Sequence, residues 1–296
     1  MKSEYIPKIL YDRGFLDVSF TGDENSPNAR FFSSGRYKYT LKLFDASRKD
    51  RISSVLRFQK SIHDNGFPCP NPVTVSRDLV FPVEDKYAAV LEFLEGATLK
   101  SPKARDFFEM GKMLGVYHNY SEGRKLDGNI KEFDADFFYS LLQDKKIPEE
   151  LMPTFRRLEN SLKNRNYRKS VYGVAHGDSH HGNFLFRGSG PSGIIDFENA
   201  YSGNLMHDLG DLVFWSRRVS ENDFGEVVSA IREGYSESRP GFIDSKEDLL
   251  LRARDKAVLN SFWKLWRVFR KREKLDSLVN SLNSLDFMES MLKDGK

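Results

Sequence analysis

Two polar motifs, separated by a short turn, constrain the fold of this chain more than any other feature. The first runs from His176 to Asn183 and reads His-Gly-Asp-Ser-His-His-Gly-Asn, and the second runs from Gly193 to Glu198 and reads Gly-Ile-Ile-Asp-Phe-Glu. Apolar stretches around them predict three short strands, over residues 171–175, 184–186 and 193–195. Glycines let the first loop turn sharply without clashes of Cβ atoms. The pattern therefore predicts a polar loop between two strands, followed by a hairpin that ends in Asp196.

Three side chains in these motifs have the chemistry that phosphoryl transfer requires. This reaction needs an acceptor hydroxyl in line with the γ-phosphate, and cations that hold the charge of the transferring group. Asp178 could receive the proton of the acceptor and orient its oxygen. Asn183 and Asp196 could bind Mg²⁺, which prefers oxygen ligands and keeps several of its waters. We therefore expect a site that uses ATP and Mg²⁺.

Two other interpretations of the first motif stay open at this point. His176, Asp178, His180 and His181 could all bind a transition metal, although the glycines disfavour a helix that would align them and no distant Cys or His cluster completes a shell. A turn with chance polar residues would explain the first motif, but not the second carboxylate after an Ile-Ile strand.

Both motifs resemble those of the aminoglycoside phosphotransferase and choline kinase superfamily, which are small-molecule relatives of protein kinases. The catalytic loop of that family reads His-Gly-Asp, a few variable residues and Gly-Asn, and its metal loop reads Ile-Asp-Phe or Ile-Asp-Trp. The resemblance implies that Asp178 is the catalytic base and that Asn183 and Asp196 bind the metal. His176 and Asp208 are expected to support the catalytic loop without touching the substrate, because Asp208-Leu209 resembles the Asp-Leu-Ala segment of the family.

The resemblance extends to the residues that bind the nucleotide. Lys42 lies in a predicted turn and strand over residues 35–44, where the family has the lysine that binds the α- and β-phosphates. The predicted strand from Tyr87 to Leu94 corresponds to the strand before the hinge between lobes. The carbonyl of Glu92 and the N–H of Leu94 are therefore the expected contacts of adenine, although a simple buried strand would have the same sequence.

Two departures from the family pattern concern Lys42. A kinase lysine is normally held by a carboxylate from the first helix of the small lobe, yet residues 51–63 contain no Asp or Glu. Asp50, at the predicted start of this helix, is an alternative partner. The loop expected over the phosphates, residues 21–30, is poor in glycine. A second hypothesis therefore stays open, in which the protein keeps the fold without catalysis and binds nucleotide or a partner as a scaffold.

We expect an α+β, protein-kinase-like fold with two lobes. Residues 1–95 would form a small lobe with an antiparallel sheet that ends at the hinge. Residues 96–296 would form a larger, mainly helical lobe that carries the catalytic and metal loops and the substrate site. Helices are predicted from Ser101-Pro102 to His118, from Phe133 to Leu142, from Leu151 to Leu162, and in about three or four further segments between Phe224 and Met291. His118 is expected to be a packed core residue.

The composition agrees with this class of protein. With 296 residues, of which 39% are hydrophobic and 30% charged, the chain can bury a sizeable core. No apolar run approaches the roughly 18 residues of a membrane span, so we expect a cytoplasmic protein that does not bind a membrane. The single cysteine, Cys69, excludes an internal disulfide. Nucleic acid is not an expected partner because no reading motif is present, and the oligomeric state is not predicted.

The acceptor is predicted only as a small molecule with a hydroxyl group. Residues 252–274 carry nine Lys or Arg against Asp255 and Glu273, which we interpret as a solvated face. Such a basic segment disfavours polycationic aminoglycosides. Trp263 could cage a quaternary ammonium such as choline, or it could cover a neighbouring helix. Amino alcohols, homoserine-like compounds and sugars stay open.

Overall fold

The computed structural model describes residues 5–21, 29–128, 135–163, 170–219 and 223–294. The chain forms two compact units. The first comprises residues 1–97, 126–130 and 185–198, and the second comprises residues 98–125, 131–184 and 199–296. Residues 185–198, which we expected in the helical lobe, belong to the first unit instead. The reason is that their hairpin packs there, where the N–H of Ile194 donates a hydrogen bond to the carbonyl oxygen of Pro68 (3.1 Å).

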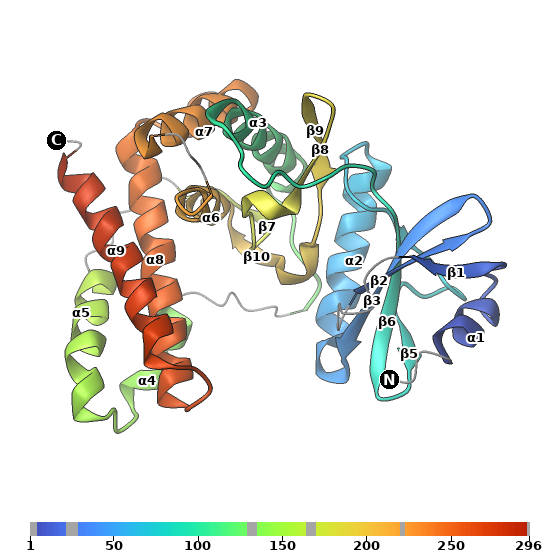
Figure 1. Cartoon of the computed structure of the whole chain (residues 1–296), viewed down its shortest axis with the longest axis horizontal. Helices are drawn as coiled ribbons and strands as arrows, with labels where there is room; N and C mark the ends of the chain where they lie inside the picture. Colours follow the sequence, from blue (N-terminus) through green and yellow to red (C-terminus); the bar gives the residue numbers. More distant parts are fainter. Residues whose placement is uncertain (1–4, 22–28, 129–134, 164–169, 220–222, 295–296) are drawn as a thin grey trace. The chain divides into compact units, whose positions relative to one another are not determined.

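An antiparallel sheet of six strands forms the centre of the first unit (Figure 1). The strand order is β1-β2-β3-β6-β4, and β5 pairs with β6. The strands are β1 (Val18–Thr21), β2 (Ala29–Ser34), β3 (Tyr37–Asp45), β4 (Pro72–Val73), β5 (Phe81–Val83) and β6 (Lys86–Glu92), and a short helix, α1 (Tyr5–Tyr11), precedes them. The predicted antiparallel sheet is therefore confirmed, and the strand expected over residues 35–44 is β3.

Alternation along β3 determines which face of the sheet carries Lys42. Leu41 and Leu43 point into one apolar cluster, whereas Phe44 points into a second cluster that includes residues of helix α2 (Lys49–Asp64). Successive side chains of a strand point to opposite faces, so Lys42 lies on the same face as Phe44. The lysine therefore emerges on the side of the sheet that α2 covers.

Helices make up most of the second unit. They are α3 (Ala104–Ser121), α4 (Ala135–Gln143), α5 (Met152–Lys163), α6 (Met206–Ser216), α7 (Phe224–Ser238), α8 (Lys246–Phe269) and α9 (Leu275–Asp294). Two strands, β7 (Tyr172–Ala175) and β10 (Tyr201–Asn204), pair antiparallel in this unit. The hairpin of β8 (Phe184–Arg187) and β9 (Gly190–Ile194) belongs to the first unit, apart from Phe184. The predicted α+β class is confirmed. Within the described ranges, no helix is both long and apolar enough to cross a bilayer.

Helix α3 begins later than the sequence predicts. The expected first turn was Ser101-Pro102, but the helix starts at Ala104. The N–H of Lys103 donates a hydrogen bond to the carboxylate of Asp106 (2.8 Å). This carboxylate satisfies a backbone donor that would otherwise lack a partner at the helix start, so Ser101 is not needed as the cap.

Helices α3 and α7 lie side by side and approach closely through glycines (Figure 1). An added Cβ at Gly111 would overlap the carbonyl oxygen of Ile231. An added Cβ at Gly234 would overlap the carbonyl oxygen of Phe108. The two backbones are therefore in direct contact at these points.

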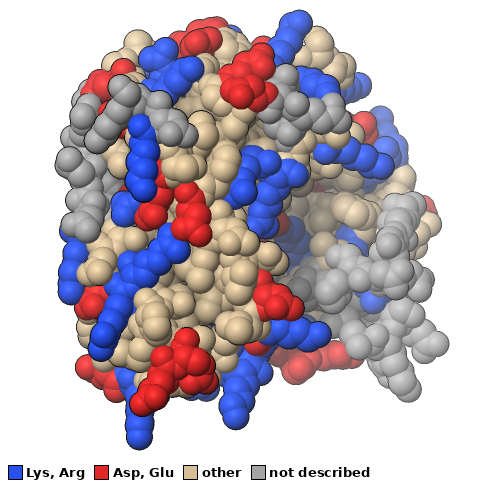
Figure 2. Space-filling view, turned by 60° about the vertical axis from the view of Figure 1, so that its left-hand side comes forward, with Lys and Arg blue, Asp and Glu red and all other residues tan. Residues whose placement is uncertain are grey.

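The basic segment over residues 252–274 is a solvated face only toward its end, where Arg270, Lys271, Arg272 and Lys274 are exposed; the part within α8 (Lys246–Phe269) is not. Its cations pair with carboxylates: Arg252 with Asp248, Lys256 with Asp211, and both Lys264 and Arg267 with Glu273. Arg252 is only 3% exposed. On the face of the molecule in Figure 2, Lys and Arg side chains alternate with Asp and Glu, and neither sign covers that face alone.

Candidate active site

Asp178 lies in a tight loop that follows β7. The residue before it, Gly177, has φ +80°, and an added Cβ there would overlap the carbonyl oxygen of Asn199. Only glycine tolerates both conditions without strain. The side chain of Asp178 is nevertheless 32% exposed. The loop therefore presents an accessible carboxylate on a backbone that has little conformational freedom.

Asn183 ends a short 3-10 turn (His181–Asn183), and its side chain is buried. Its amide nitrogen donates a hydrogen bond to the main-chain carbonyl of Asp178 (2.8 Å). This orientation leaves the side-chain oxygen of Asn183 to serve as a ligand for a hard cation. His180 Nδ1 accepts a hydrogen bond from the N–H of Gly182 (3.0 Å), and His180 Nε2 lies 3.8 Å from the Asp178 carboxylate.

Asp208, at the start of α6, is completely buried and holds the backbone of the first motif. One carboxylate oxygen accepts a hydrogen bond from the N–H of His176 (2.8 Å), and the other accepts one from the N–H of Gly177 (2.9 Å). Burial alone would raise the pKa of Asp208, but hydrogen bonds from His118 and from the backbone hold that pKa below its ordinary value. An ionised carboxylate therefore fixes the two residues before Asp178.

His118 and Tyr235 complete this buried network. His118 Nε2 lies 3.2 Å from the Asp208 carboxylate, and His118 Nδ1 lies 2.9 Å from the Tyr235 hydroxyl. Burial lowers the pKa of His118 and raises that of Tyr235, so both groups are neutral at pH 7. Tyr235 then donates to Nδ1, and Nε2–H donates to Asp208. His118 is a packed residue, as expected, but nothing in the sequence indicated its link to Asp208 or the part of Tyr235.

Lys42 and Asp196 form an ion pair within the first unit. Their side chains are 20% and 36% exposed, respectively. Asp196 has φ +69°, a left-handed conformation that is uncommon for residues other than glycine. Asp50, the alternative partner considered above, is exposed, and Lys42 pairs with the carboxylate of the second motif instead. The carboxylate missing from α2 is thus replaced by Asp196 in this structure.

Glu92 and Leu94 lie where the chain leaves the sheet of the first unit. Glu92 is the last residue of β6, and its N–H donates to the carbonyl of Asn71 (2.8 Å). Leu94 is partly buried, and its side chain lies beside Gly193, where an added Cβ would meet the Leu94 Cδ2 at 2.8 Å. The strand end that is expected to contact adenine therefore packs against the second motif.

The structure gathers the predicted residues in two groups. Lys42, Glu92, Leu94 and Asp196 belong to the first unit, and His176, Asp178, Asn183 and Asp208 belong to the second. Residues 22–28 of the loop expected over the phosphates lie outside the described residues. No cluster of three or more His, Cys, Asp or Glu within the described ranges is arranged to hold a metal ion, which gives the histidine-based transition-metal interpretation no support.

A cavity of about 720 Å³ opens at Asp178 within the second unit. Side chains of α4, α6, α8 and α9 line it. Seven of its fifteen lining residues are apolar or aromatic, and all of its described lining residues belong to the second unit. This volume lies in the range of small-molecule sites. Asp178 is thus the carboxylate that faces a space large enough for an acceptor.

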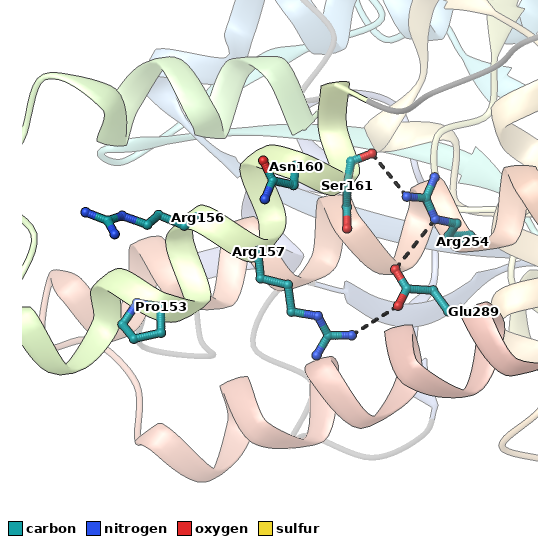
Figure 3. Close-up of a pocket in the computed structure, with 7 residues that line it drawn as sticks. All are labelled: Pro153, Arg156, Arg157, Asn160, Ser161, Arg254 and Glu289. Carbon is teal, nitrogen blue, oxygen red and sulfur yellow. Dashed lines mark hydrogen bonds and ion pairs between the residues drawn. The ribbon is translucent and has the colours of Figure 1, made fainter.

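A second cavity of about 590 Å³ lies between α5, α8 and α9 (Figure 3). Arg157 and Arg254 both point toward Glu289, whereas Arg156 points away from it. Arg157 Nη2 lies 3.2 Å from Glu289, and Arg254 also donates to the carbonyl of Ser161 (3.2 Å). These arginines already have partners, so this cavity ties helices together and is a weaker candidate for a ligand site.

Comparison with known proteins agrees with the motifs. The family model described as "Phosphotransferase enzyme family" matches residues 18–242, which is more than half of the chain. A homoserine kinase of Chelativorans sp. (strain BNC1) is 29% identical over 266 residues, covering 86% of this chain and 79% of that protein. A homoserine kinase of Neisseria meningitidis serogroup B is 25% identical over 272 residues, covering 85% and 86%.

Solved structures show the same fold. A microcompartment-associated aminopropanol kinase matches with a TM-score of 0.71 at 16% identity, covering 97% of this chain and 95% of that chain. A choline kinase of Streptococcus pneumoniae matches with a TM-score of 0.67 at 18% identity, covering 97% and 99%. At these identities the likeness shows the fold alone, which is the protein-kinase-like fold expected from the sequence.

Proposed function

The chain belongs to the phosphotransferase enzyme family and is a small-molecule kinase with an alcohol as acceptor; from this we propose that Asp178 is its catalytic base. The observation that supports this role most directly is that Asp178 lines the cavity of the second unit and stands on a backbone fixed by Asp208. A base must be held where the hydroxyl proton leaves, and a fixed, accessible carboxylate meets that condition.

In the proposed reaction, the acceptor oxygen forms a bond to the γ-phosphorus of ATP. The bond between that phosphorus and the bridging oxygen of the β-phosphate breaks, and ADP leaves with the electron pair. The hydroxyl proton passes to the Asp178 carboxylate. We assign Lys42, held by Asp196, to the α- and β-phosphates, and the Glu92 carbonyl and Leu94 N–H to adenine.

We further propose that the oxygens of Asn183 and Asp196 hold Mg²⁺. Both residues offer the hard oxygen ligands that this ion prefers, and Asn183 already directs its amide nitrogen away to the Asp178 carbonyl (2.8 Å). When bound, Mg²⁺ would neutralise charge on the phosphate oxygens. Asp196 also pairs with Lys42, which orients this carboxylate.

The test is Mg²⁺-dependent release of ADP from ATP with a panel of homoserine, choline, ethanolamine, methylthioribose, hexoses and aminoglycosides. Homoserine comes first because the relatives described above are homoserine kinases. Asp178→Asn should lower turnover by at least roughly 100-fold, since general-base catalysis contributes that much or more. Binding of a non-hydrolysable ATP analogue, measured by calorimetry, should stay unchanged. Asp144→Asn, an exposed site, is the matched control and should keep full turnover.

Full turnover by Asp178→Asn would refute the role of this residue as the base. Binding of ATP without turnover of any acceptor would favour the alternative, a kinase-fold scaffold that has lost its chemistry. Removal of divalent cations with EDTA should stop turnover, and added Mg²⁺ should restore it; turnover in EDTA would refute the assignment of Asn183 and Asp196.

A further inference from the structure

All three tryptophans of the chain line the cavity that opens at Asp178. They are Trp215 on α6 and Trp263 and Trp266 on α8. Phe137, Phe138 and Leu141 of α4 line the same cavity from another helix. A cavity of about 720 Å³ with such walls is suited to a flat, apolar ligand, because aromatic rings gain free energy by burial and by stacking.

Each tryptophan already has a cationic side chain of the protein near its ring. Arg218 lies 4.6 Å from the ring centroid of Trp215. Lys264 lies 4.4 Å from that of Trp263 and Arg267 lies 5.2 Å from it. An aromatic cage for a quaternary ammonium needs free ring faces and no cation close by. Here Lys264 and Arg267, which share Glu273 as their partner, already lie at the ring of Trp263, so a choline cage there is disfavoured.

Charges in the lining also disfavour an amine. Among the described lining residues, Asp178 is the one carboxylate, whereas Arg218, Lys256 and Lys264 are cations. An amino alcohol would need a carboxylate for its ammonium group, and Asp178 is already assigned to the hydroxyl. Lys256 pairs with the buried Asp211 (2.7 Å) and Lys264 pairs with Glu273, so Arg218 is the lining cation that has no carboxylate partner among the described residues.

The indole N–H of Trp215 is a buried polar group in a residue of the cavity wall. This nitrogen is buried and has no hydrogen-bond partner among the described residues. A buried donor without a partner costs free energy, and because this nitrogen has almost no accessible surface, the wall would have to shift before a ligand could accept from it. The cavity thus combines an aromatic wall with a cation, Arg218, that no described carboxylate offsets.

We propose that the acceptor is an alcohol with a bulky aromatic or similarly flat apolar body, uncharged or anionic, and not an amine. This inference rests on the proposed function, because it takes Asp178 as the group that receives the hydroxyl proton. It goes beyond that function by naming the chemical class that the cavity selects.

Tryptophan fluorescence tests this inference without requiring turnover, since every tryptophan of the chain lines the cavity. Suitable probes are 2-phenylethanol, which is neutral, 3-phenyllactate, which is anionic, and 2-amino-1-phenylethanol, which is cationic but similar in size. Homoserine and choline represent small charged acceptors. The neutral or the anionic aromatic alcohol should bind at least about tenfold more tightly than the cationic one, and should release ADP from ATP with the higher kcat/KM.

Variants of the tryptophans test whether the cavity wall contacts the acceptor. Trp263→Leu should raise KM for the aromatic alcohol at least tenfold and leave kcat within about twofold, whereas Trp215→Phe keeps a ring and removes the N–H. Tyr172→Leu, at an exposed aromatic outside the cavity, should change neither constant. Should Trp263→Leu fail to fold, the comparison of the three phenyl probes on the wild-type protein still decides the question.

The experiment distinguishes failure of this inference from failure of the proposed function. Turnover of choline or homoserine with a higher kcat/KM than either aromatic alcohol would overturn the inference and leave the proposed function intact. Turnover of no acceptor, with ATP still bound, would overturn the proposed function. Tightest binding of the cationic phenyl probe would overturn the charge argument, and with it the inference.

Discussion

Asp211 is a buried carboxylate beside the cavity, and the only cation paired with it is that of Lys256 among the residues that the structure describes. Lys256 Nζ lies 2.7 Å from one oxygen and 2.8 Å from the other. Burial raises the pKa of Asp211 to about 6, and Lys256 only partly opposes this. The carboxylates of Asp208 and Asp178 act on it in the same direction as burial.

This raised pKa predicts a pH dependence of stability. Between about pH 3.8 and about pH 6, Asp211 keeps its proton in the folded state but loses it in the unfolded chain. Its stabilising contribution to the free energy of unfolding is therefore fully present below about pH 3.8 and is lost as pH rises through about 6. The free energy of unfolding of the wild type, relative to Asp211→Asn, should therefore fall by up to about 3 kcal/mol between pH about 4 and about 7. Urea unfolding followed by tryptophan fluorescence measures this difference. A difference that does not vary with pH would contradict the assignment, and Asp144→Asn should show no such trend.

The candidate site residues proposed above stand in local sequence motifs, but the partners that the structure gives them do not. Asp178, Asn183 and Asp196 stand in short motifs with fixed spacing, so local sequence points to them. The pairing of Lys42 with Asp196 joins residues more than a hundred positions apart. The absence of Asp and Glu from residues 51–63 does not predict which other carboxylate pairs with Lys42. Tyr235 has no motif at all, and only the packing of α7 brings it to His118.

At the scale of elements, the contact of α3 with α7 predicts a sensitive position. Gly234→Ala would place a methyl group against the carbonyl oxygen of Phe108, so one helix must move. We expect a loss of roughly 1–3 kcal/mol in the free energy of unfolding, although alanine favours a helix over glycine by about 1 kcal/mol. The exposed neighbour Glu233→Ala is the control and should change stability by less than about 0.5 kcal/mol. Unchanged stability of Gly234→Ala in chemical denaturation would show that the helices do not touch there.

Elements with strong periodicity were predictable, whereas elements that depend on a distant partner were not. The strand over residues 87–94 and the helix over residues 151–162 correspond to β6 and α5. β10 (Tyr201–Asn204) has no apolar alternation and forms by pairing with β7. The cations of α8 were misread because charge alone does not reveal which carboxylates other helices bring to them.

At the scale of the whole molecule, the two units carry different natural reporters. Cys69, the single cysteine, is buried in the first unit, and burial raises its pKa to about 12. All three tryptophans belong to the second unit. Thiol labelling therefore follows opening of the first unit, and tryptophan fluorescence follows unfolding of the second.

We predict that a non-hydrolysable ATP analogue with Mg²⁺ slows the labelling of Cys69 by a thiol reagent at least about tenfold. The reason is that the proposed nucleotide residues Lys42, Glu92, Leu94 and Asp196 all lie in the first unit, and a ligand of the folded state stabilises it. Labelling rates with and without the analogue, in dilute urea, measure the effect. Unchanged labelling at saturating analogue would argue against nucleotide binding by this unit, and labelling in full denaturant is the control for reagent reactivity.

The left-handed backbone at Asp196 affects which substitutions this position tolerates during evolution. Glycine adopts φ +69° without steric cost, so replacement of Asp196 by glycine would relieve local strain while removing the carboxylate that holds Lys42. Selection for folding alone would therefore accept the substitution Asp196→Gly. Under the proposed function, selection on catalysis keeps the carboxylate at a position where the backbone conformation favours glycine.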